Sequence, residues 1–455
     1  MEVSLRVSRL RSLRLKNCRV FYRGSIVDDA ELLIENGRIK EVSRLSIRKP
    51  VDETFDLKGL LIIPGLIDVH VHLRGLNLAY KEDYDTGTMA AASGGVTTVL
   101  DMPNTDPPTV DLESLDLRIK AAEPKLYANV GFYSFVPEDL TEVSELAEAG
   151  VFGFKLFMHR RMPGYRFETL EDLKDILKAV GEVGLPLLVH AEDRGLLETV
   201  RSENPDGGLE TFEKALSEES EEKAVKTVLE ALEAVKKARV HFCHVSSIGA
   251  LRLIEAAKAS GLPVSCEATP HHLLLTREVY ERLGFYGLVD PPLRSKESSE
   301  ALWSAVEHGV VDCIATDHAP HTLEEKTVGG LWSLKTGFPG LETLLPLMLD
   351  CVNKGRLSLS ELVRLTAHNP ARLFRIADRG CIEVGYWADL TAVDLKKEAI
   401  IDPSSFKSKA KHSPFEGWRV KGVPETVFVN GELVLLDGEV VCGPGVGRVL
   451  RPGVS

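Results

Sequence analysis

Six residues that can bind metal ions or transfer protons stand in, or at the ends of, apolar strand-like runs. They are His70, His72, Lys155, His190, His244 and Asp317. The runs are well separated along the chain; examples are FGFKLFM, LPLLVHA, RVHFCHV and VDCIATD. If these strands lie parallel, their carboxyl ends meet on one face of the fold, and the six side chains gather in a single site.

His70 and His72 have the spacing of two imidazoles on one face of a strand, because strand side chains alternate between two faces. Imidazole is the commonest metal ligand of proteins and suits zinc. By itself the pair also fits two half-buried histidines that bond to protein partners. The histidines at later strand ends favour a metal. So does Asp317, because a charge beside a buried strand needs a partner.

Lys155 lies inside an apolar run, which allows two interpretations. In the first, the amine extends along its own apolar stem to reach water. In the second, burial disfavours the charged form, so the amine loses its proton. A neutral amine can add carbon dioxide, and the resulting carbamate is a carboxylate on a long stem that can bridge two metal ions.

Two metal ions about 3.5–4 Å apart share a hydroxide at neutral pH and polarise a carbonyl oxygen. Asp317 stands where it can take the proton of that hydroxide and pass it to a leaving nitrogen. The chemistry predicted from the residues is therefore hydrolysis, or its reversal, of an amide-type bond.

The runs that carry these residues belong to a series of eight between residues 61 and 383. Amphipathic stretches such as LEDLKDILKAVGEVG and EEKAVKTVLEALEAVKKA separate most of them. This alternation predicts an α/β fold, a (β/α)8 TIM barrel with some long loops, whose site lies at the C-terminal ends of the strands.

The two ends of the chain are similar to each other. AELLIENGRIKEV and ETVFVNGELVLLDGEVV both alternate apolar and polar residues around an Asn-Gly pair, which is the strongest short signal for a hairpin. Residues 1–60 and 384–455 are therefore predicted to form one small composite β-sandwich, and residues 61–383 the barrel. The last residues, GPGVGRVLRPGVS, are expected to be a surface extension.

Composition excludes several classes of function. With 55 Lys and Arg against 68 Asp and Glu, the net charge of −13 argues against nucleic-acid binding. No apolar run has the length of a membrane span or of a secretory signal, and the seven scattered cysteines contain no CxxC pair. We expect a cytoplasmic protein with a small-molecule substrate. The Arg- and Ser-rich start resembles a transit peptide faintly and fits an alternating strand at least as well.

Several long motifs resemble those of the dihydroorotase family in the amidohydrolase superfamily. PGLIDVHVHLR at 64–74 and GCIEVGYWADLTAVDL near the C-terminus are similar to the superfamily pattern. The narrower family is indicated by DMPNT at 101–105, CEATPHHLLLT at 266–276, DPPLR at 290–294, TDHAPHTLEEK at 316–326 and GFPGLETLLPLML at 337–349. The resemblance covers nearly the whole chain, including the composite β-sandwich.

The resemblance implies two zinc ions per chain. The ligands that it implies are His70, His72 and Asp317 for the first ion, and His190 and His244 for the second. Lys155 in carboxylated form, together with a hydroxide, is implied to bridge the two ions. Asp317 also acts as the general acid/base.

The implied reaction is the reversible cyclisation of N-carbamoyl-L-aspartate to L-dihydroorotate and water, in pyrimidine biosynthesis. In ring opening, the bridging hydroxide attacks the ring amide carbonyl and Asp317 protonates the leaving nitrogen. Arg74, Asn104 and His321 are implied to hold the carboxylate of the substrate. A planar guanidinium matches a carboxylate, and its positive charge offsets the negative field of the chain.

The chain departs from the family pattern at three places. Arg74 is followed by Gly75-Leu76-Asn77, where the family has Asp or Glu and then Pro-Gly. Asp290 replaces the asparagine of an NPPLR motif, and a carboxylate there rejects an anion unless it is neutralised or turned away. Lys155 stands where many bacterial relatives have aspartate.

Other activities and partners remain open at the level of sequence. Allantoinases and dihydropyrimidinases/hydantoinases share the metal ligands, and an inactive scaffold is a further alternative that the complete ligand set argues against. A homodimer is the default for a soluble enzyme, and association with aspartate transcarbamoylase is a second expectation.

The remaining histidines receive structural interpretations. His159 is expected in a surface or lid segment, and Cys243 in core packing. We expect a supporting role beside the site for His271, His272 and His318, and no functional cluster around His308, His368 and His412.

Overall fold

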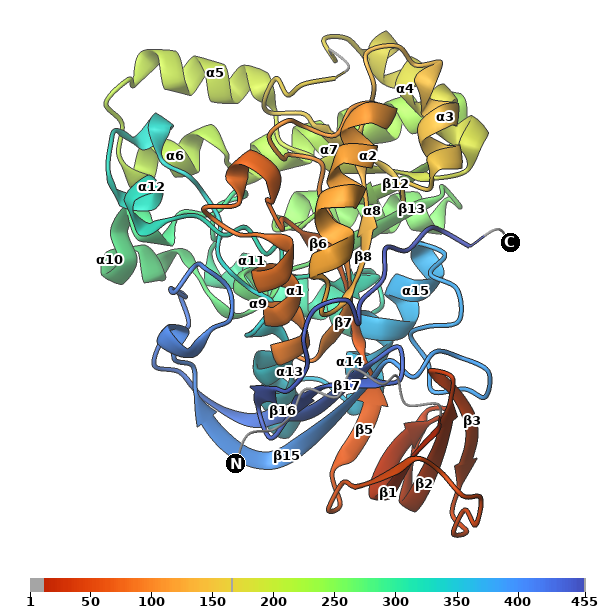
Figure 1. Ribbon diagram of the computed structural model, residues 1–455. Coiled ribbons are helices and arrows are strands. Elements are labelled where there is room, and N and C mark those ends of the chain that lie inside the picture. The colour runs from red at the N-terminus through yellow and green to blue at the C-terminus, as the bar shows by residue number, and fades with distance from the viewer. Residues whose placement is uncertain (1–11, 165–166, 454–455) are drawn as a thin grey trace.

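The computed structural model describes residues 12–164 and 167–453, and it contains a closed barrel of parallel strands with helices around it (Figure 1). Each of the eight predicted runs contains a barrel strand. The strands are β6 (Leu66–Val71), β7 (Val96–Asp101), β8 (Asn129–Phe132) continued by β9 (Ser134–Phe135), β10 (Phe154–Phe157), β11 (Pro186–His190), β12 (Arg239–Phe242), β13 (Val264–Ala268) and β14 (Cys313–Ile314).

The barrel closes between its first strand, β6, and the residues that follow its last strand, β14. Val71 pairs in parallel with His318, and the backbone N–H of His72 donates to the carbonyl of His318 at 2.8 Å. The buried carboxylate of Asp68 accepts from the N–H of Thr316 at 3.2 Å. Closure therefore brings His72 next to Asp317, although 245 residues separate them.

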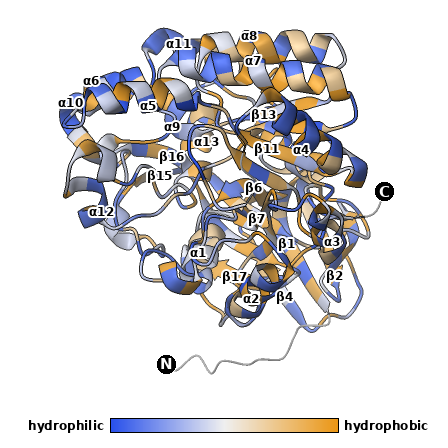
Figure 2. Cartoon of the chain, turned by 90° about the horizontal axis from the view of Figure 1, so that it is seen from above, coloured by the Kyte–Doolittle hydropathy of each residue, from blue (hydrophilic) through white to orange (hydrophobic). Residues whose placement is uncertain are grey.

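The helices outside the barrel have the periodicity of amphipathic helices. In α4, Leu173, Ile176, Leu177 and Val180 are buried, which places one apolar stripe against the barrel. Figure 2 shows apolar and polar residues alternating along α7 and α8. The longer helices are α1 (Tyr84–Ser93), α2 (Leu112–Ala122), α3 (Glu142–Ala149), α4 (Leu170–Val183), α5 (Arg194–Glu203), α7 (Glu218–Val235), α8 (Ile248–Ala259), α11 (Lys296–Glu307) and α13 (Leu344–Asn353).

Short helices occupy the connections of the barrel. They are α6 (Leu209–Ala215), α9 (Pro270–Leu274), α10 (Tyr280–Leu283), α12 (Leu323–Thr327), α14 (Leu359–Val363) and α15 (Asn369–Leu373). Several follow strand ends, where they shape the loops around the site. Throughout residues 12–164 and 167–453, the helices are too short or too polar to cross a bilayer.

The two ends of the chain meet in one nine-stranded sheet, in which the red and the blue strands of Figure 1 lie together. Both Asn-Gly pairs form the predicted hairpin turns, with Asn36 and Asn430 in the left-handed region at φ 51° and 53°. The strands are β1 (Ser12–Tyr22), β2 (Ser25–Glu35), β3 (Arg38–Ser43), β4 (Glu53–Asp56), β5 (Leu61–Pro64), β15 (Leu390–Ile400), β16 (Arg419–Val429), β17 (Glu432–Leu436) and β18 (Glu439–Val440). The chain thus forms a TIM barrel with a β domain made from both termini, while the transit-like residues 1–11 lie outside the described part.

Two expectations about this β region were wrong. The first run of the series of eight, LLIIPGLIDVH, is predicted as a single strand, but it is divided at Gly65, and its first half, β5, pairs with β1 and β15 in the terminal sheet. The C-terminal tail is not a mere surface extension. Val449 pairs with Val130 of β8, and the N–H of Leu450 donates to the carbonyl of Val130 at 2.8 Å. The division of the chain at residues 60 and 383 stays a prediction.

Candidate active site

The six residues predicted from the strand ends come together at the C-terminal end of the barrel, and all of them are buried. His70 and His190 lie at the C-terminal ends of β6 and β11, and Lys155 lies within β10. His244 and Asp317 follow the ends of β12 and β14. A cavity of about 310 Å³ opens between them. Its lining residues include His70, His72, His190, His244 and Asp317, together with Arg74, Asn104 and His321.

His70 and His72 are each held through Nδ1, which directs Nε2 toward Asp317. Nδ1 of His70 bonds to Glu267, and Nδ1 of His72 lies 2.6 Å from Oδ1 of Asn104. Nε2 of the two rings lies 3.3 Å and 3.0 Å from Oδ1 of Asp317. Two nitrogens and one carboxylate oxygen therefore converge on one point, as ligands of a single cation do.

His190 and His244 form the second half of the imidazole group. Nε2 of His190 lies 2.6 Å from Oε2 of Glu192, which leaves Nδ1 available. The ring centres of His190 and His244 are 4.4 Å apart. Burial lowers the pKa of both imidazoles well below the ordinary value. Both rings are therefore neutral at physiological pH, and neutral imidazole is the form that binds a metal.

Lys155 has a buried amine whose hydrogen-bond partner is the thiol of Cys243, 3.0 Å away. The first of the two interpretations, in which the amine reaches water, is wrong, since the residue is only 1% exposed. Lys155 and Phe157 of β10 pair with Leu188 and His190 of β11, so the amine lies on the strand next to His190. Its place between the imidazoles fits the alternative in which it carries a carboxylate.

The donor set fits a zinc centre. Nδ1 of His244 is buried without a hydrogen-bond partner among the described residues, and one ligand atom each of His70, His244 and Asp317 lies within 4.8 Å of the others. Burial by itself raises the pKa of Asp317, but His70 and His72 outweigh it and hold this pKa well below the usual range. Asp317 is therefore an anion whose oxygen faces two imidazole nitrogens, and a carboxylate together with imidazoles is a donor set that zinc takes.

Three residues of the site have left-handed backbone conformations, which are uncommon for residues other than glycine. Arg74 has φ 60°, His244 has φ 35° and Asp317 has φ 47°. All three follow barrel strands, at points where the chain turns away from the strand direction. Strain of this kind concentrates at functional sites, because the surrounding structure can hold it there.

Arg74 and His321 lie together beside Asp317, as the resemblance implies. Nη2 of Arg74 is 3.0 Å from Nε2 of His321, and both side chains are buried. Burial lowers the pKa of Arg74 to about 10, so the guanidinium is still a cation at neutral pH. Asn104 lines the same cavity, but its Oδ1 is engaged by His72, so its amide N–H groups are the part left for a substrate.

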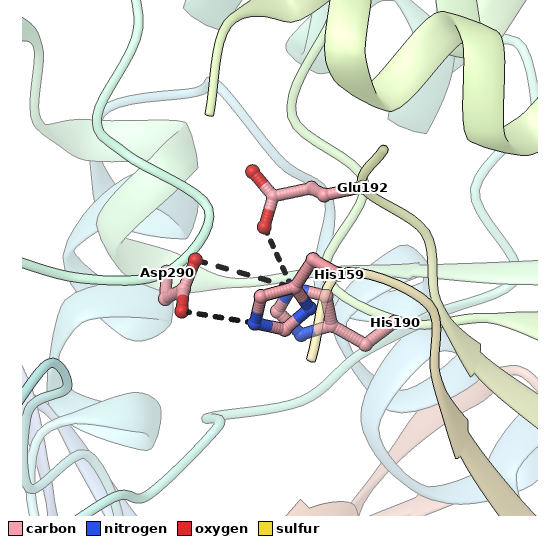
Figure 3. A group of neighbouring side chains, drawn as sticks. All are labelled: His159, His190, Glu192 and Asp290. Atoms are coloured by element: carbon pink, nitrogen blue, oxygen red, sulfur yellow. Dashed lines mark hydrogen bonds and ion pairs between the residues drawn. The ribbon is translucent and has the colours of Figure 1, made fainter. Parts of the chain in front are cut away.

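Asp290 is neutralised by its neighbours. Its Oδ2 forms an ion pair with Arg160. The same oxygen lies 3.4 Å from Nε2 of His159, as Figure 3 shows. Burial raises the pKa of Asp290, but Arg160 and His159 outweigh it and hold this pKa below its usual range. The departure from the asparagine of the family therefore places a matched charge, not a free anion, in the wall of the cavity.

His159 is buried against the site, so its expected place in a surface segment was wrong. Its ring stacks on that of His190 with the centres 4.0 Å apart, and it is only 2% exposed (Figure 3). The strand ends identify His190 but not His159, because the loop that carries His159 is held by Asp290, 131 positions further along the chain. His412, expected to have no cluster, is buried and its Nε2 lies 2.9 Å from the carbonyl of His321.

The supporting roles expected of two other histidines are confirmed. Nδ1 of His272 bonds to Thr269 at 2.8 Å and its Nε2 to the carbonyl of Pro291 at 3.1 Å. Nδ1 of His318 accepts from the N–H of Gly340 at 3.1 Å. Cys243 is packed in the core, where it also contacts the Lys155 amine.

The chain is similar to several proteins named dihydroorotase. It is 35% identical over 449 residues to one from Methanosarcina acetivorans, with 96% of this chain and 95% of the relative covered. It is 39% identical over 427 residues to one from Pyrococcus horikoshii, with 93% of each chain covered. A protein named L-hydantoinase from Paenarthrobacter aurescens is 34% identical over 444 residues, with 95% of this chain and 96% of the relative covered.

Solved structures resemble this fold over almost its full length. An L-hydantoinase (dihydropyrimidinase) from Arthrobacter aurescens superimposes with a TM-score of 0.92 at 33% identity, covering 96% of this chain and 99% of that one. Residues 61–434 match the sequence model of the Amidohydrolase family. This span contains all of the barrel strands and the residues gathered around Asp317. The chain belongs to the amidohydrolase family.

Proposed function

We propose that this protein is a dihydroorotase, which interconverts N-carbamoyl-L-aspartate and L-dihydroorotate with loss or gain of water. The observation that carries the proposal is the pair Arg74 and His321, a buried cation with a ring donor, in the same cavity as Asp317. A substrate with a carboxylate next to a cyclic amide matches both parts of this cavity.

The residues present fit two zinc ions. His70, His72 and Asp317 would hold one ion and His190 and His244 the other, with Lys155 as a carboxylated bridge between them. Zinc ions in such a site lower the pKa of water and polarise the carbonyl to be attacked. Glu267, Asn104 and Glu192 would orient the imidazoles of these ligands. An oxygen of each hydrogen-bonds to one ring nitrogen of its histidine, which leaves the other ring nitrogen to bind zinc.

Asp317 transfers the proton in the proposed reaction. In ring opening, its carboxylate takes a proton from the attacking water and gives it to the ring nitrogen that leaves. Ring closure follows the same path in reverse. A low pKa keeps Asp317 ionised before the attack, which is the state that a base needs.

A hydantoinase is the alternative that a specific observation favours, since the solved L-hydantoinase superimposes with a TM-score of 0.92. Hydantoins and dihydropyrimidines are cyclic amides that need no carboxylate. A substrate of that kind leaves the buried Arg74 without its anion, which costs binding energy because an unpaired polar group stays desolvated.

The test is a comparison of kcat/KM for L-dihydroorotate, hydantoin, allantoin and 5,6-dihydrouracil with one zinc-loaded preparation. We expect L-dihydroorotate to be preferred by at least about tenfold, because sites that recognise a polar substituent reject its absence strongly. A preference for hydantoin or dihydrouracil contradicts the proposal. No turnover of any cyclic amide favours the inactive scaffold.

We further propose that the protein forms a homodimer and associates with aspartate transcarbamoylase, as expected for an enzyme that uses carbamoyl aspartate. The mass of the purified protein in solution tests the first statement. Co-purification with aspartate transcarbamoylase from the same source tests the second.

A further inference from the structure

The first turn of α7 is buried in part, although it belongs to the acidic run SEESEEK at 217–223. Glutamates at a helix start ordinarily face water, and a buried glutamate needs a partner. Within this turn Ser220 and Glu221 are both buried. The Ser220 hydroxyl oxygen accepts from the N–H of Asp193 at 2.7 Å, three residues after His190. The turn therefore holds the segment that follows one proposed ligand of the second ion.

Glu221 holds the segment that follows the other proposed ligand, His244. Its Oε1 accepts from the N–H of Ser246 at 2.8 Å, and its Oε2 accepts from the Ser246 hydroxyl at 2.6 Å. Both oxygens thus fix one residue, which lies two positions after His244. Because His244 has a left-handed φ of 35°, its turn needs contacts of this kind to keep its shape.

Arg294 connects the two segments. Its guanidinium is buried, and its Nε donates to the hydroxyl oxygen of Ser246 at 3.0 Å. Its Nη2 lies 3.4 Å from Oε2 of Glu221 and 4.0 Å from Oε1 of Glu192. The other oxygen of Glu192 is the one that lies 2.6 Å from Nε2 of His190. A single guanidinium therefore lies beside the groups that follow both histidines.

We propose that Glu221 is a positioning residue for the second zinc ion. Together with Ser220 and Arg294 it forms a clamp, the α7 clamp, which fixes the turns after β11 and β12. These turns set the directions of His190 and His244, whose ring centres are 4.4 Å apart. The inference rests on the proposed two-zinc function and extends it to a helix outside the barrel.

The α7 clamp should act on one ion and not on the other. Two proposed ligands of the first ion, His70 and His72, are held through Nδ1 by Glu267 and Asn104. Neither of these two partners belongs to α7. Loss of the clamp should therefore weaken binding of the second ion selectively, whereas a general loss of structure weakens binding of both.

The test withdraws zinc from the loaded protein with a chelator and counts the ions that remain per chain. We expect Glu221→Ala to bind one of its two ions at least about tenfold more weakly than the wild type, as is usual when a group that orients a metal ligand is lost. The affinity for the other ion should not change. Anomalous diffraction at the zinc edge from crystals of the half-loaded variant should place the remaining ion beside His70 and His72.

Asp389→Ala is the matched control. Asp389 is a buried carboxylate that, like Glu221, pairs with a buried arginine, Arg379, and accepts from a backbone N–H, that of Asn430 at 2.6 Å. It directly precedes β15 in the terminal sheet. Its loss should lower the stability of the fold and leave both zinc affinities as they are in the wild type.

A milder variant keeps the test decisive if Glu221→Ala does not fold. Ser220→Ala combined with Ser246→Ala removes only two hydroxyl groups, both of which make contacts of the α7 clamp. We expect this double variant to bind the same ion about threefold more weakly or less tightly still, because each lost hydrogen bond has a modest net effect.

The outcomes separate this inference from the proposed function, because zinc is counted without any substrate. A wild-type protein that binds fewer than two ions contradicts both. If the wild type binds two ions, the inference alone is overturned by unchanged affinities in Glu221→Ala and the double serine variant. It is also overturned by an equal loss of both ions, or by the same selective loss in Asp389→Ala.

Discussion

Oδ1 of Asn104 lies 2.6 Å from Nδ1 of His72, and this contact points Nε2 of His72 at Asp317, 3.0 Å away. A residue expected to bind the substrate carboxylate thereby also orients a proposed metal ligand. The two roles are compatible, because the amide oxygen faces the imidazole and the amide nitrogen remains for the substrate.

Asn104→Ala should therefore weaken zinc binding as well as substrate binding. We expect a loss of about 10–100-fold in zinc affinity, the usual effect of removing a group that orients a metal ligand. Competition with a chelator measures this affinity. The matched variant is Arg74→Met, which should raise the KM for L-dihydroorotate and leave the zinc affinity unchanged. If Asn104→Ala alters only KM, its bond to His72 has no part in metal binding.

Asp317→Asn should lower kcat by about 10²–10⁴-fold, because an amide cannot accept and return a proton. The measurement is kcat in preparations whose zinc content has been determined, since Asp317 is also an expected ligand. Asp312→Asn is the control. Asp312 is five positions earlier, at the opposite end of β14, and pairs with Lys258, so its loss should leave kcat close to that of the wild type. A fully active Asp317→Asn variant excludes the proposed proton transfer.

Arg160 and Asp290 should show strong coupling in substrate binding. Arg160→Met leaves Asp290 as an unmatched carboxylate in the cavity wall, so the KM for L-dihydroorotate should rise about tenfold. Adding Asp290→Asn removes the carboxylate and should restore most of the affinity. The double-mutant cycle then gives a coupling of about 1 kcal/mol or more. Additive effects of the two substitutions mean that Asp290 does not act on the substrate through its charge.

Lys326 should make stability depend on pH. Its amine is buried and donates to the carbonyls of Leu288 at 3.1 Å and Gly337 at 2.7 Å, and burial lowers its pKa to about 7. Between that value and the pKa of an unfolded lysine, about 10.4, the unfolded chain binds more protons than the folded one. The free energy of unfolding therefore rises with pH in this window.

The slope attributable to Lys326 is at most about 1.4 kcal/mol per pH unit. Denaturant unfolding of the wild type and of Lys326→Met between pH 7 and 10 measures it as the difference between the two curves. We expect the stability of the wild type relative to Lys326→Met to increase with pH. A constant difference over this range shows that Lys326 keeps an ordinary pKa in the fold.

The sequence predicts the barrel, and the gathering of the six site residues at the strand ends, because both depend on local patterns. A strand that ends in histidine, such as β11 with His190, can be recognised without its neighbours. The Asn36-Gly37 and Asn430-Gly431 turns are equally local, since asparagine and glycine adopt positive φ at low cost.

The features that sequence did not predict depend on contacts between distant segments. Gly65 divides an apolar run because β5 pairs with β1 and β15, which lie more than 40 residues before it and more than 320 after it. Glu267 holds His70 across 197 positions, and Lys81 meets His321 across 240. A buried glutamate or a loop lysine has no periodic signal of its own, so only the closed barrel reveals its partner.

The central claim is a two-zinc centre that acts on dihydroorotate, and a zinc titration of the metal-free protein tests it most directly. The rate of L-dihydroorotate hydrolysis is followed against added zinc, with Lys155→Ala as the matched variant that lacks the bridging residue. We predict that activity reaches its maximum at about two zinc ions per chain, and that Lys155→Ala retains little activity at any zinc concentration. Full activity with one zinc ion or none, or no hydrolysis with two bound, contradicts the account.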